Sequence, residues 1–271
     1  MKTKVRYLLI TLFTITISCK ENSKKKETTA NTDIETLESE TPVSKKTSSD
    51  VEIIPIEHAT AVLQWNNITI YVDPVGGAET FSTYNKPDLI LITDIHGDHF
   101  NLETLEALNT SKAKIMVPQT VADKMPDSFT PQLDILNNGD TKERYGILVE
   151  AIPMYNLREE ALKFHKKGRG NGYVLNMDGE RIYFSGDTED IPEMRALENI
   201  DKAFICMNLP YTMTPKSAAD AVLEFKPAEV YPYHYRGRPD VSDVSIFRNL
   251  VNKGDSEIKV VQMDWYPNND Y

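Results

Sequence analysis

The stretch ITDIHGDHF, residues 92–100, carries two aspartates and two histidines within six positions: Asp94, His96, Asp98 and His99. Imidazoles and carboxylates gathered without thiolates are typical of catalytic Zn²⁺, Fe or Mn²⁺ sites rather than of structural zinc sites. Side chains at alternate positions of an extended turn can converge on one cation, while the adjacent fourth one points to a second cation. The stretch therefore predicts a metal centre. The alternative is a polar turn at a helix entry with surface histidines.

Other residues able to bind metal lie farther along the chain. His165 is in a loop punctuated by glycines, Asp187 follows an apolar run, and His234 ends the run EVYPYH. Loops at strand ends, held by a rigid sheet, are where functional sites are usually built. Two cations bridged by a carboxylate can activate a hydroxide and stabilise the oxyanion that its attack forms. The alternatives are a solvated loop for His165, a helix cap for Asp187 and a core histidine for His234.

Strand and helix patterns alternate around these loops. Residues 51–77 predict a hairpin that turns at Asn66–Asn67, and residues 88–93 are an apolar run typical of a strand covered on both faces. Helices are expected over 101–109, over 214–225 and from Ser242 onward. Further strands are expected over 113–117, 147–156, 172–188, 202–209, 229–235 and 258–267. The pattern indicates a mixed α/β layer protein with two similar halves that divide near residue 146.

In this order, ITDIHGDHF, His165, FSGDT and PYHY resemble the metallo-β-lactamase-fold hydrolase superfamily. Within it, the chain is most similar to the branch containing ascorbate-phosphate lactonase and N-acylphosphatidylethanolamine phospholipase D. The likeness also includes IEHATAVLQWNNITIYVDP, IYFSGDTEDIPEM and YPYHYRG, and it covers residues 51–271. It implies one α/β (α+β) hydrolase domain, folded as a four-layer αββα sandwich. True β-lactamase activity is not expected, because the resemblance is closer to the lactonase and phospholipase branch, although the fold alone does not decide the substrate.

The resemblance also implies seven metal ligands and two supporting residues. The first ion would be held by Asp94, His96 and His165, the second by Asp98, His99 and His234, and Asp187 would bridge them. Asp73 matches an aspartate that supports the metal-binding loops, and His58 would lie close by, facing the ligands or the substrate.

Two positions depart from the superfamily's pattern. Asp94 stands where the motif T-H-x-H-x-D-H has its first histidine. The resulting Asp–His–His set can still bind metal, but a carboxylate is a harder ligand than an imidazole. The implied cofactor is therefore two divalent ions, with Zn²⁺ expected first and Mn²⁺ or Fe favoured by Asp94. His165 comes nine residues after Asn156, so its assignment depends on its spacing to Asp187.

The leading hypothesis is a hydrolase in which a metal-bound hydroxide, oriented by Asp98 as the catalytic residue, attacks an ester-like, lactone or phosphodiester centre. The alternative is a non-catalytic metal-binding or sensing lipoprotein of the same fold, with one metal site weakened by Asp94. Two groups nearby are open to two interpretations each. The basic run of Lys166, Lys167 and Arg169 either meets an anionic substrate or forms a solvated loop, and Tyr211 and Tyr235 either line the pocket or pack.

The chain is acidic, with a formal net charge of −11 over 271 residues. This argues against a nucleic-acid partner bound through general electrostatics, because phosphate backbones attract basic surfaces. A phosphate-containing substrate stays possible, since bound metal can invert the local charge. The expected partner is a small-molecule or lipid-like substrate.

Residues 1–18 are expected to be a signal peptide of the lipoprotein type. Three basic residues precede an apolar stretch too short to span a bilayer comfortably, and TISC places a small residue before Cys19. An ordinary secretory signal is the alternative. Residues 19–50 would be the lipidated cysteine and a disordered tether, because they contain too few apolar residues to offset the entropy of ordering. The protein is therefore expected to be exported and lipid-anchored to a bacterial membrane, facing the periplasm or the cell surface. The other cysteine, Cys206, is expected to be a buried apolar residue.

Overall fold

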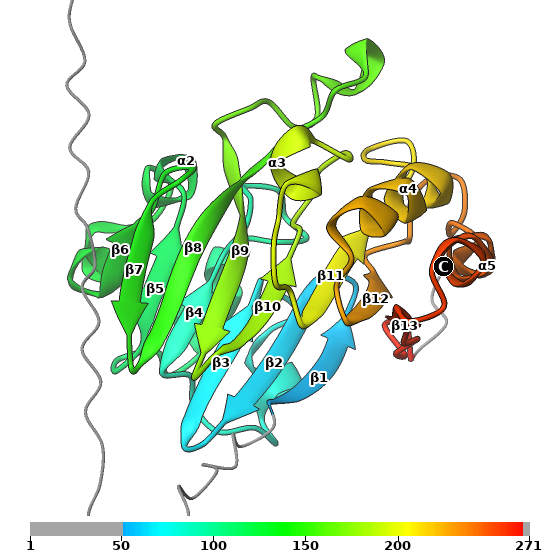
Figure 1. Cartoon of the computed structure of the whole chain (residues 1–271). Coiled ribbons are helices and arrows are strands. Elements are labelled where there is room, and N and C mark those ends of the chain that lie inside the picture. The colour runs from blue at the N-terminus through cyan, green and yellow to red at the C-terminus, as the bar shows by residue number, and fades with distance from the viewer. Residues whose placement is uncertain (1–50, 268–271) are drawn as a thin grey trace, which may run out of the picture. The chain divides into compact units, whose positions relative to one another are not determined.

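Two β-sheets lie face to face in the computed structural model, which describes residues 51–267 (Figure 1). The expected signal peptide, Cys19 and the tether lie outside the described residues. Within residues 51–267, no helix is both long and apolar enough to cross a bilayer.

The first sheet has the strand order β1-β2-β3-β4-β5-β6 and the second the order β13-β12-β11-β10-β9-β8-β7. The strands of the first sheet are β1 (Glu52–Glu57), β2 (Thr60–Trp65), β3 (Ile68–Val72), β4 (Leu89–Leu91), β5 (Lys114–Val117) and β6 (Leu133–Ile135). The strands of the second sheet are β7 (Thr141–Arg144), β8 (Ile147–Met154), β9 (Gly170–Met177), β10 (Glu180–Phe184), β11 (Lys202–Cys206), β12 (Glu229–Tyr233) and β13 (Lys259–Val260).

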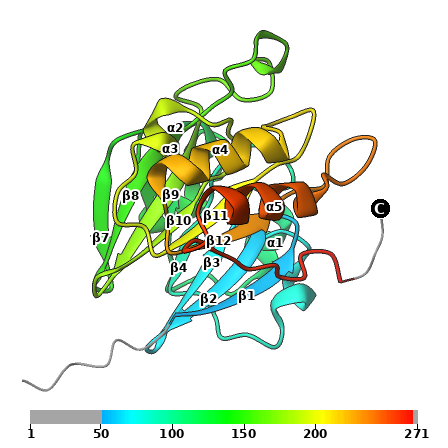
Figure 2. The same ribbon diagram turned by 45° about the vertical axis from the view of Figure 1, so that its right-hand side comes forward.

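Helices cover the outer faces of the two sheets. The α-helices are α1 (Leu102–Ala107), α2 (Gln119–Ala122), α3 (Pro192–Arg195), α4 (Pro215–Phe225) and α5 (Val244–Gly254). The 3₁₀ helices are η1 (Ala78–Phe81), η2 (Asp127–Gln132) and η3 (Glu159–Ala161). Figure 2 shows α4 and α5 side by side over the second sheet. The four-layer sandwich predicted from the sequence is confirmed.

The two sheets repeat one plan. In the first, β1 to β3 are antiparallel neighbours and β3 to β6 are parallel. In the second, β7 to β10 are antiparallel neighbours and β10 to β13 are parallel. The first sheet ends at Ile135 and the second begins at Thr141, a few residues before the division that the sequence predicts near residue 146.

Alternate residues of the first sheet are buried on opposite faces. Leu63 and Ile70 belong to the apolar core between the sheets, whereas their neighbours Val62 and Tyr71 belong to a second core under α1 and α2. A strand with both faces covered reads as a continuous apolar run, because neither face meets water. This is why DLILIT has no alternation of polar and apolar residues. Burial on both faces also holds β4 in place, and with it the start of the loop that follows.

Several sequence-based boundaries differ from the structure, and three of the differences have a clear physical reason. Residues 51–65 are two strands rather than one, because His58 has a positive φ of 57° and the chain reverses there to pair Glu57 with Thr60. The helix expected from Ser242 begins at Val244, where the Asp243 side chain accepts a hydrogen bond from the Ser245 amide. The last predicted strand, 258–267, is reduced to β13, because the chain beyond it turns back and the Trp265 carbonyl accepts the His58 amide hydrogen.

Candidate metal centre

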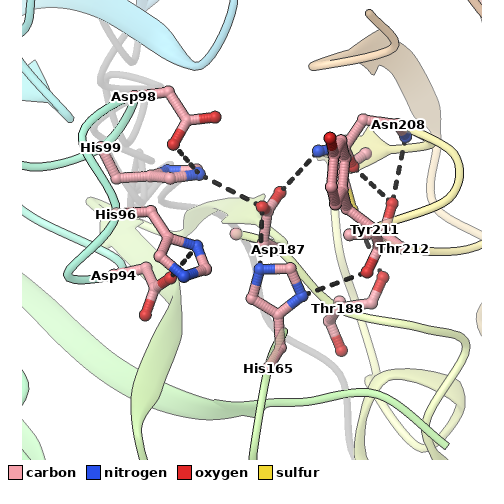
Figure 3. Close-up of polar contacts among 12 residues, drawn as sticks. Asp94, His96, Asp98, His99, His165, Asp187, Thr188, Asn208, Tyr211 and Thr212 are labelled. Atoms are coloured by element: carbon pink, nitrogen blue, oxygen red, sulfur yellow. Dashed lines mark hydrogen bonds and ion pairs between the residues drawn. The ribbon is translucent and has the colours of Figure 1, made fainter. Parts of the chain in front are cut away.

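The polar residues predicted from the sequence lie where parallel strands of both sheets end. Asp73 follows β3, and ITDIHGDHF follows β4. From the second sheet, Asp187 follows β10 and His234 follows β12. Ligand sites in α/β sheets form beyond the carboxyl ends of the strands. Here two such edges meet, and Figure 3 shows the side chains converging from both.

Asp73 fixes the orientation of His99. The Asp73 carboxylate accepts hydrogen bonds from the Thr93 amide at 2.7 Å and the Thr93 hydroxyl at 2.6 Å. The Thr93 hydroxyl hydrogen is therefore used in its bond to Asp73 and cannot be donated to His99. The His99 Nδ1 hydrogen is in turn donated to Asp73, 2.8 Å away. Burial raises the pKa of Asp73, and these hydrogen bonds act against that rise. With Nδ1 as the donor, neutral His99 presents the lone pair of Nε2 to the centre.

His165 is oriented in the same way by a different set of groups. The Asn156 amide donates its two hydrogens to the carbonyls of Ala161 and Tyr211, at 2.9 and 2.7 Å. The His165 Nδ1 hydrogen can then go only to the Tyr211 carbonyl, 3.2 Å away. The lone pair of Nε2 is left facing Asp187, and this buried nitrogen has no hydrogen-bond partner.

The Asp187 carboxylate lies between three histidine side chains. Its Oδ1 is 3.0 Å from His234 Nε2, and its Oδ2 is 3.1 Å from His165 Nε2 and 3.4 Å from His99 Nε2. The Nε2 atoms of His99 and His234 are themselves 3.1 Å apart. All four residues are buried. Lone pairs of imidazoles and a carboxylate at these distances repel each other unless positive charge lies among them.

The pKa shifts of Asp187 and His99 also indicate that the cluster is stabilised by positive charge. Burial opposes ionisation of both Asp187 and His99, yet the net shifts favour the charged forms. The neighbouring His234, His99 and His165 hold the pKa of Asp187 well below its usual range. The carboxylates of Asp187, Asp98 and Asp73 raise the pKa of His99 well above its usual value. A proton shared within the cluster, or a cation, would satisfy these groups.

The ligand atoms converge in three groups that could hold a metal ion: Asp94, His96 and His165; His99, Asp187 and His234; and His58, Asp98 and His234. All seven residues that the resemblance implies as ligands are thus brought together, along with His58. The lone pairs of His99 and His165 are set for coordination by hydrogen bonds from Nδ1, the usual arrangement of metal-binding histidines. The donor set of imidazoles and carboxylates fits Zn²⁺, Fe or Mn²⁺.

Asp98 lies at the open side of the centre. Its side chain is 42% exposed, and its Oδ2 is 3.4 Å from His58 Nε2 and 3.6 Å from His234 Nε2. Burial opposes ionisation of Asp98, but the histidines around it lower its pKa further than burial raises it. His58 is held from behind by the Tyr266 hydroxyl, 2.8 Å from Nδ1, and its pKa is lowered to about 3, mainly by burial. Near neutral pH the pair is an ionised carboxylate beside an uncharged imidazole.

Asp94 is fully buried and bound to an arginine. Its Oδ1 accepts a hydrogen bond from Arg169 Nε at 3.0 Å, and its Oδ2 accepts one from Arg169 Nη2 at 2.6 Å. His96 Nδ1 lies 3.0 Å from the same Oδ2. Arg169 is therefore neither a solvated loop residue nor a substrate-facing one, the two roles that the basic run suggests.

A cavity of about 480 Å³ opens onto the centre. Its lining residues are His58, His96, Asp98, Phe164, His165, Asp187, Asn208, Tyr211, Arg236, Gly237 and Arg238. Phe164 and Tyr211 form an aromatic side of it, with ring centroids 4.9 Å apart. Tyr211 is thus a pocket residue, whereas Tyr235 packs on Tyr266.

Sequence reasoning missed five of the lining residues: Phe164, Asn208, Arg236, Gly237 and Arg238. Asn208 carried a usable signal, since it follows an apolar strand run as Asp187 does, and its Nδ2 lies 3.4 Å from Asp187 Oδ1. Arg236 and Arg238 directly follow the His234 motif. Their approach to the cavity depends on Gly237, because a Cβ there would lie 1.7 Å from the Leu209 carbonyl oxygen.

Comparison with known proteins gives one family and several relatives. A family model described as beta-lactamase superfamily domain matches residues 52–234. A UPF0173 metal-dependent hydrolase of Thermococcus onnurineus is 32% identical over 171 residues, which cover 61% of this chain and 75% of the relative. One from Thermococcus kodakarensis is 31% identical over 183 residues, which cover 65% of this chain and 80% of the relative.

Solved structures agree with this. A protein from Parabacteroides distasonis, assigned as a metal-dependent hydrolase, is similar with a TM-score of 0.72 and 36% identity, over 80% of this chain and 94% of that one. CmlA, a diiron β-hydroxylase from Streptomyces venezuelae, has a TM-score of 0.59 at 19% identity, over 80% of this chain and 53% of CmlA. The second likeness concerns the fold alone.

Replacing Asp73 should weaken metal binding without removing any predicted ligand. In Asp73→Asn one of the two acceptor oxygens becomes an amide donor, so His99 loses the group that fixes its Nδ1 hydrogen. We expect zinc affinity of the metal-stripped protein to fall about 10–100-fold, measured by calorimetric titration. Asp140→Asn, at an exposed turn, is the control and should bind as the wild type does. Unchanged affinity in a folded Asp73→Asn protein would contradict the assignment.

Proposed function

This chain belongs to the beta-lactamase superfamily and, within it, to the UPF0173 metal-dependent hydrolases, and from that membership we propose that it cleaves ester-like, lactone or phosphodiester bonds in substrates bearing an anionic group. It is a metal-dependent hydrolase. The observation that carries the proposal is the buried Asp187 carboxylate among three histidine Nε2 atoms, 3.0 to 3.4 Å away, at the base of an open cavity.

The proposed cofactor is a pair of divalent cations. They would be held by the seven predicted ligands, Asp94, His96, Asp98, His99, His165, Asp187 and His234. Divalent cations at this place would activate a water nucleophile and stabilise the negative charge that develops on the substrate. Zn²⁺ suits the imidazole-rich set, and the carboxylate of Asp94 also favours Mn²⁺ or Fe.

Asp98 and His58, at the cavity, have separate proposed roles in orienting the attacking water. Ionised Asp98 can accept a hydrogen bond from a water molecule in the cavity and orient it, because its carboxylate lies at the boundary between the buried cluster and solvent. His58, uncharged near neutral pH, lies against Asp98 on one side and the Tyr266 hydroxyl on the other. It therefore limits the positions that the Asp98 side chain can adopt.

The rest of the cavity lining supports the proposed substrate class. Arg236 and Arg238 provide fixed positive charge, and guanidinium groups bind carboxylates and phosphates through paired donors. Phe164 and Tyr211 provide an aromatic surface for an apolar part of the substrate. A lipid-like or aromatic ester with a phosphate or carboxylate fits both features. A specific relationship to the lactonase and phospholipase D branch stays a prediction, since the names of the relatives specify no substrate.

A non-catalytic sensing protein of the same fold has less support. Buried charged groups cost stability. In a metal site that had lost its function, some of them would therefore be expected to be replaced by apolar or uncharged residues. Every carboxylate and imidazole of that cluster is instead present, and the cavity leads to them.

Asp187→Asn should abolish tight metal binding and hydrolysis together. The substitution removes the charge that the three histidines surround, so we expect metal affinity to fall by more than the roughly 100-fold typical of supporting residues. After zinc or manganese supplementation, the purified wild type should retain at least one equivalent of metal by elemental analysis. It should also cleave at least one of an aryl acetate, an aryl phosphodiester and a γ-lactone.

Asp190→Asn is the matched control, because Asp190 lies in the same segment but pairs with Arg195 outside the cluster. It should keep both metal and activity. A metal-supplemented wild type holding well under one equivalent would refute the proposal.

Arg238→Met should weaken recognition of charged substrates only. Methionine retains an apolar stem and removes the exposed guanidinium, so KM for an aryl phosphodiester should rise about tenfold with kcat little changed. KM for a neutral aryl acetate should not move. Arg248→Met, on the exposed side of α5 away from the cavity, should leave both substrates unaffected. Equal losses for both substrates would show that Arg238 acts on the catalytic groups rather than on substrate charge.

We also propose that the protein is exported and lipid-anchored. The support is the sequence of residues 1–19, with a basic start, an apolar stretch and a small residue before Cys19. Expressed in a bacterial host, the full chain should partition into the detergent phase, and Cys19→Ser should move it to the aqueous phase, because the lipid attachment atom is lost. Cys206→Ser is the control and should partition with the wild type. A wild-type chain found only in the aqueous phase would exclude the anchor.

A further inference from the structure

The two halves of the metal centre differ in their fixed charge. We propose that Arg169 is a positioning residue that neutralises Asp94, so that the first cluster (Asp94, His96 and His165) binds a divalent cation more weakly than the second cluster (His99, Asp187 and His234, with Asp98). The inference deepens the proposed function and rests on it, since it assigns unequal affinities to sites that the proposed function requires.

The Asp94–Arg169 pair is built as a permanent contact. The guanidinium spans both carboxylate oxygens, at 3.0 and 2.6 Å, and the two side chains are 0% and 16% exposed. Paired charge-assisted hydrogen bonds of this kind are strong and directional, and a guanidinium does not lose its proton in proteins. A positive charge therefore resides next to the first cluster whether or not metal is present.

The carboxylates of the second cluster form no such ion pair with an arginine among the described residues, although Arg236 and Arg238 line the cavity that opens onto them. Within residues 51–267, the ion pairs of Asp98 and Asp187 are all with histidines. With those histidines neutral and coordinating, two carboxylates face a divalent ion there. In the first cluster Asp94 is already balanced by Arg169, and the charge of Asp187, whose Oδ2 lies 3.1 Å from His165 Nε2, is shared by the two clusters. Asp98 is the carboxylate that only the second cluster has. The electrostatic attraction for a cation is thus concentrated in the second cluster.

The coordination capacity of Asp94 is reduced as well. Its Oδ2 already meets Arg169 Nη2 and lies 3.0 Å from His96 Nδ1. A cation in the first cluster would have to share this oxygen with the guanidinium. Figure 3 shows Asp94 and His96 next to each other, on the other side of Asp187 from Asn208.

Arg169 also has an effect in the opposite direction, because it holds the Asp94 carboxylate in place, and a fixed ligand binds metal better than a mobile one. The two effects have opposite signs on removal of Arg169. If repulsion dominates, a neutral side chain strengthens the first cluster; if orientation dominates, it weakens it. A guanidinium and a divalent ion a few ångströms apart repel enough to change affinity about tenfold even when screened by water, so we expect repulsion to dominate.

Zinc titration of the full chain after removal of metal tests this. Calorimetry of the wild type should resolve one tight and one weaker zinc ion, differing about tenfold or more. In Arg169→Gln the weaker site should tighten about tenfold while the tight site stays unchanged. In Arg169→Lys, which keeps the charge and loses the paired contact, the weaker site should stay weak.

Arg144→Gln is the matched control, because Arg144 binds Asp134 through the same two-point contact, at 2.8 and 2.7 Å, away from the centre. It should leave both zinc affinities unchanged. Far-UV circular dichroism and the thermal midpoint identify a variant that fails to fold. The wild-type titration then still decides the matter, since it needs no substitution.

Two results would overturn the inference: two zinc ions of equal affinity in the wild type, or a folded Arg169→Gln protein whose weaker site becomes weaker still. Either result leaves the proposed hydrolase intact, because both clusters would still bind metal. A wild type that binds no zinc, manganese or iron contradicts the proposed function itself. That result differs from the two that overturn only the inference about Arg169.

Discussion

The structure depends on the requirement for positive charge around the buried Asp187 carboxylate. A carboxylate out of contact with water is unstable unless it is paired, and its neighbours here are three imidazole nitrogens at 3.0 to 3.4 Å. Those imidazoles come from the loop after β4, the residue after β12 and the loop before β9, so both sheets must meet at one edge for the cluster to form. The parallel halves of the two sheets supply that edge, and the antiparallel halves extend the sandwich away from it.

Holding the cluster together requires backbone conformations that non-glycine residues seldom adopt. His58, Asp73 and His234 all have positive φ, at 57°, 45° and 47°. Residues in such conformations persist only where the surrounding structure determines them, and they concentrate at functional sites. The first sheet provides support for Asp73, because its central strands β2 to β5 are buried on both faces and cannot shift register without exposing a core. The apolar cores thus determine where the polar side chains lie.

Much of this could be predicted from the sequence. The alternation of strands and helices and the division into two halves follow from apolar runs and the residues that end them. The convergence of Asp94, His96, Asp98, His99, His165, Asp187 and His234 on one place was implied by the resemblance to the metallo-β-lactamase fold. The contact between Asp94 and Arg169 could not be predicted, since 75 positions separate them and a basic run looks the same whether it faces solvent or a buried acid. The turn at His58 was missed because a positive φ leaves no mark on the sequence without glycine or asparagine. The placement of Arg236 and Arg238 depends on the packing of Gly237 against Leu209, which is tertiary information.

Asp94, in place of the histidine of the superfamily motif, affects both the stability of the site and its metal binding, and the two effects can be considered separately. As a buried acid it needs a partner, and Arg169 supplies one, so Asp94 itself is satisfied by protein groups alone. The groups around Asp187 in the second cluster are not satisfied in this way. His234 Nδ1 is buried without a hydrogen-bond partner, as is His165 Nε2 of the first cluster, and within residues 51–267 the side-chain partners of Asp187 are imidazoles and the Asn208 amide. A pair such as Asp94–Arg169 is explained by stability. An unsatisfied cluster that opens onto a cavity is costly to stability and is explained by what it binds, and so the case for a functional metal rests on the second cluster.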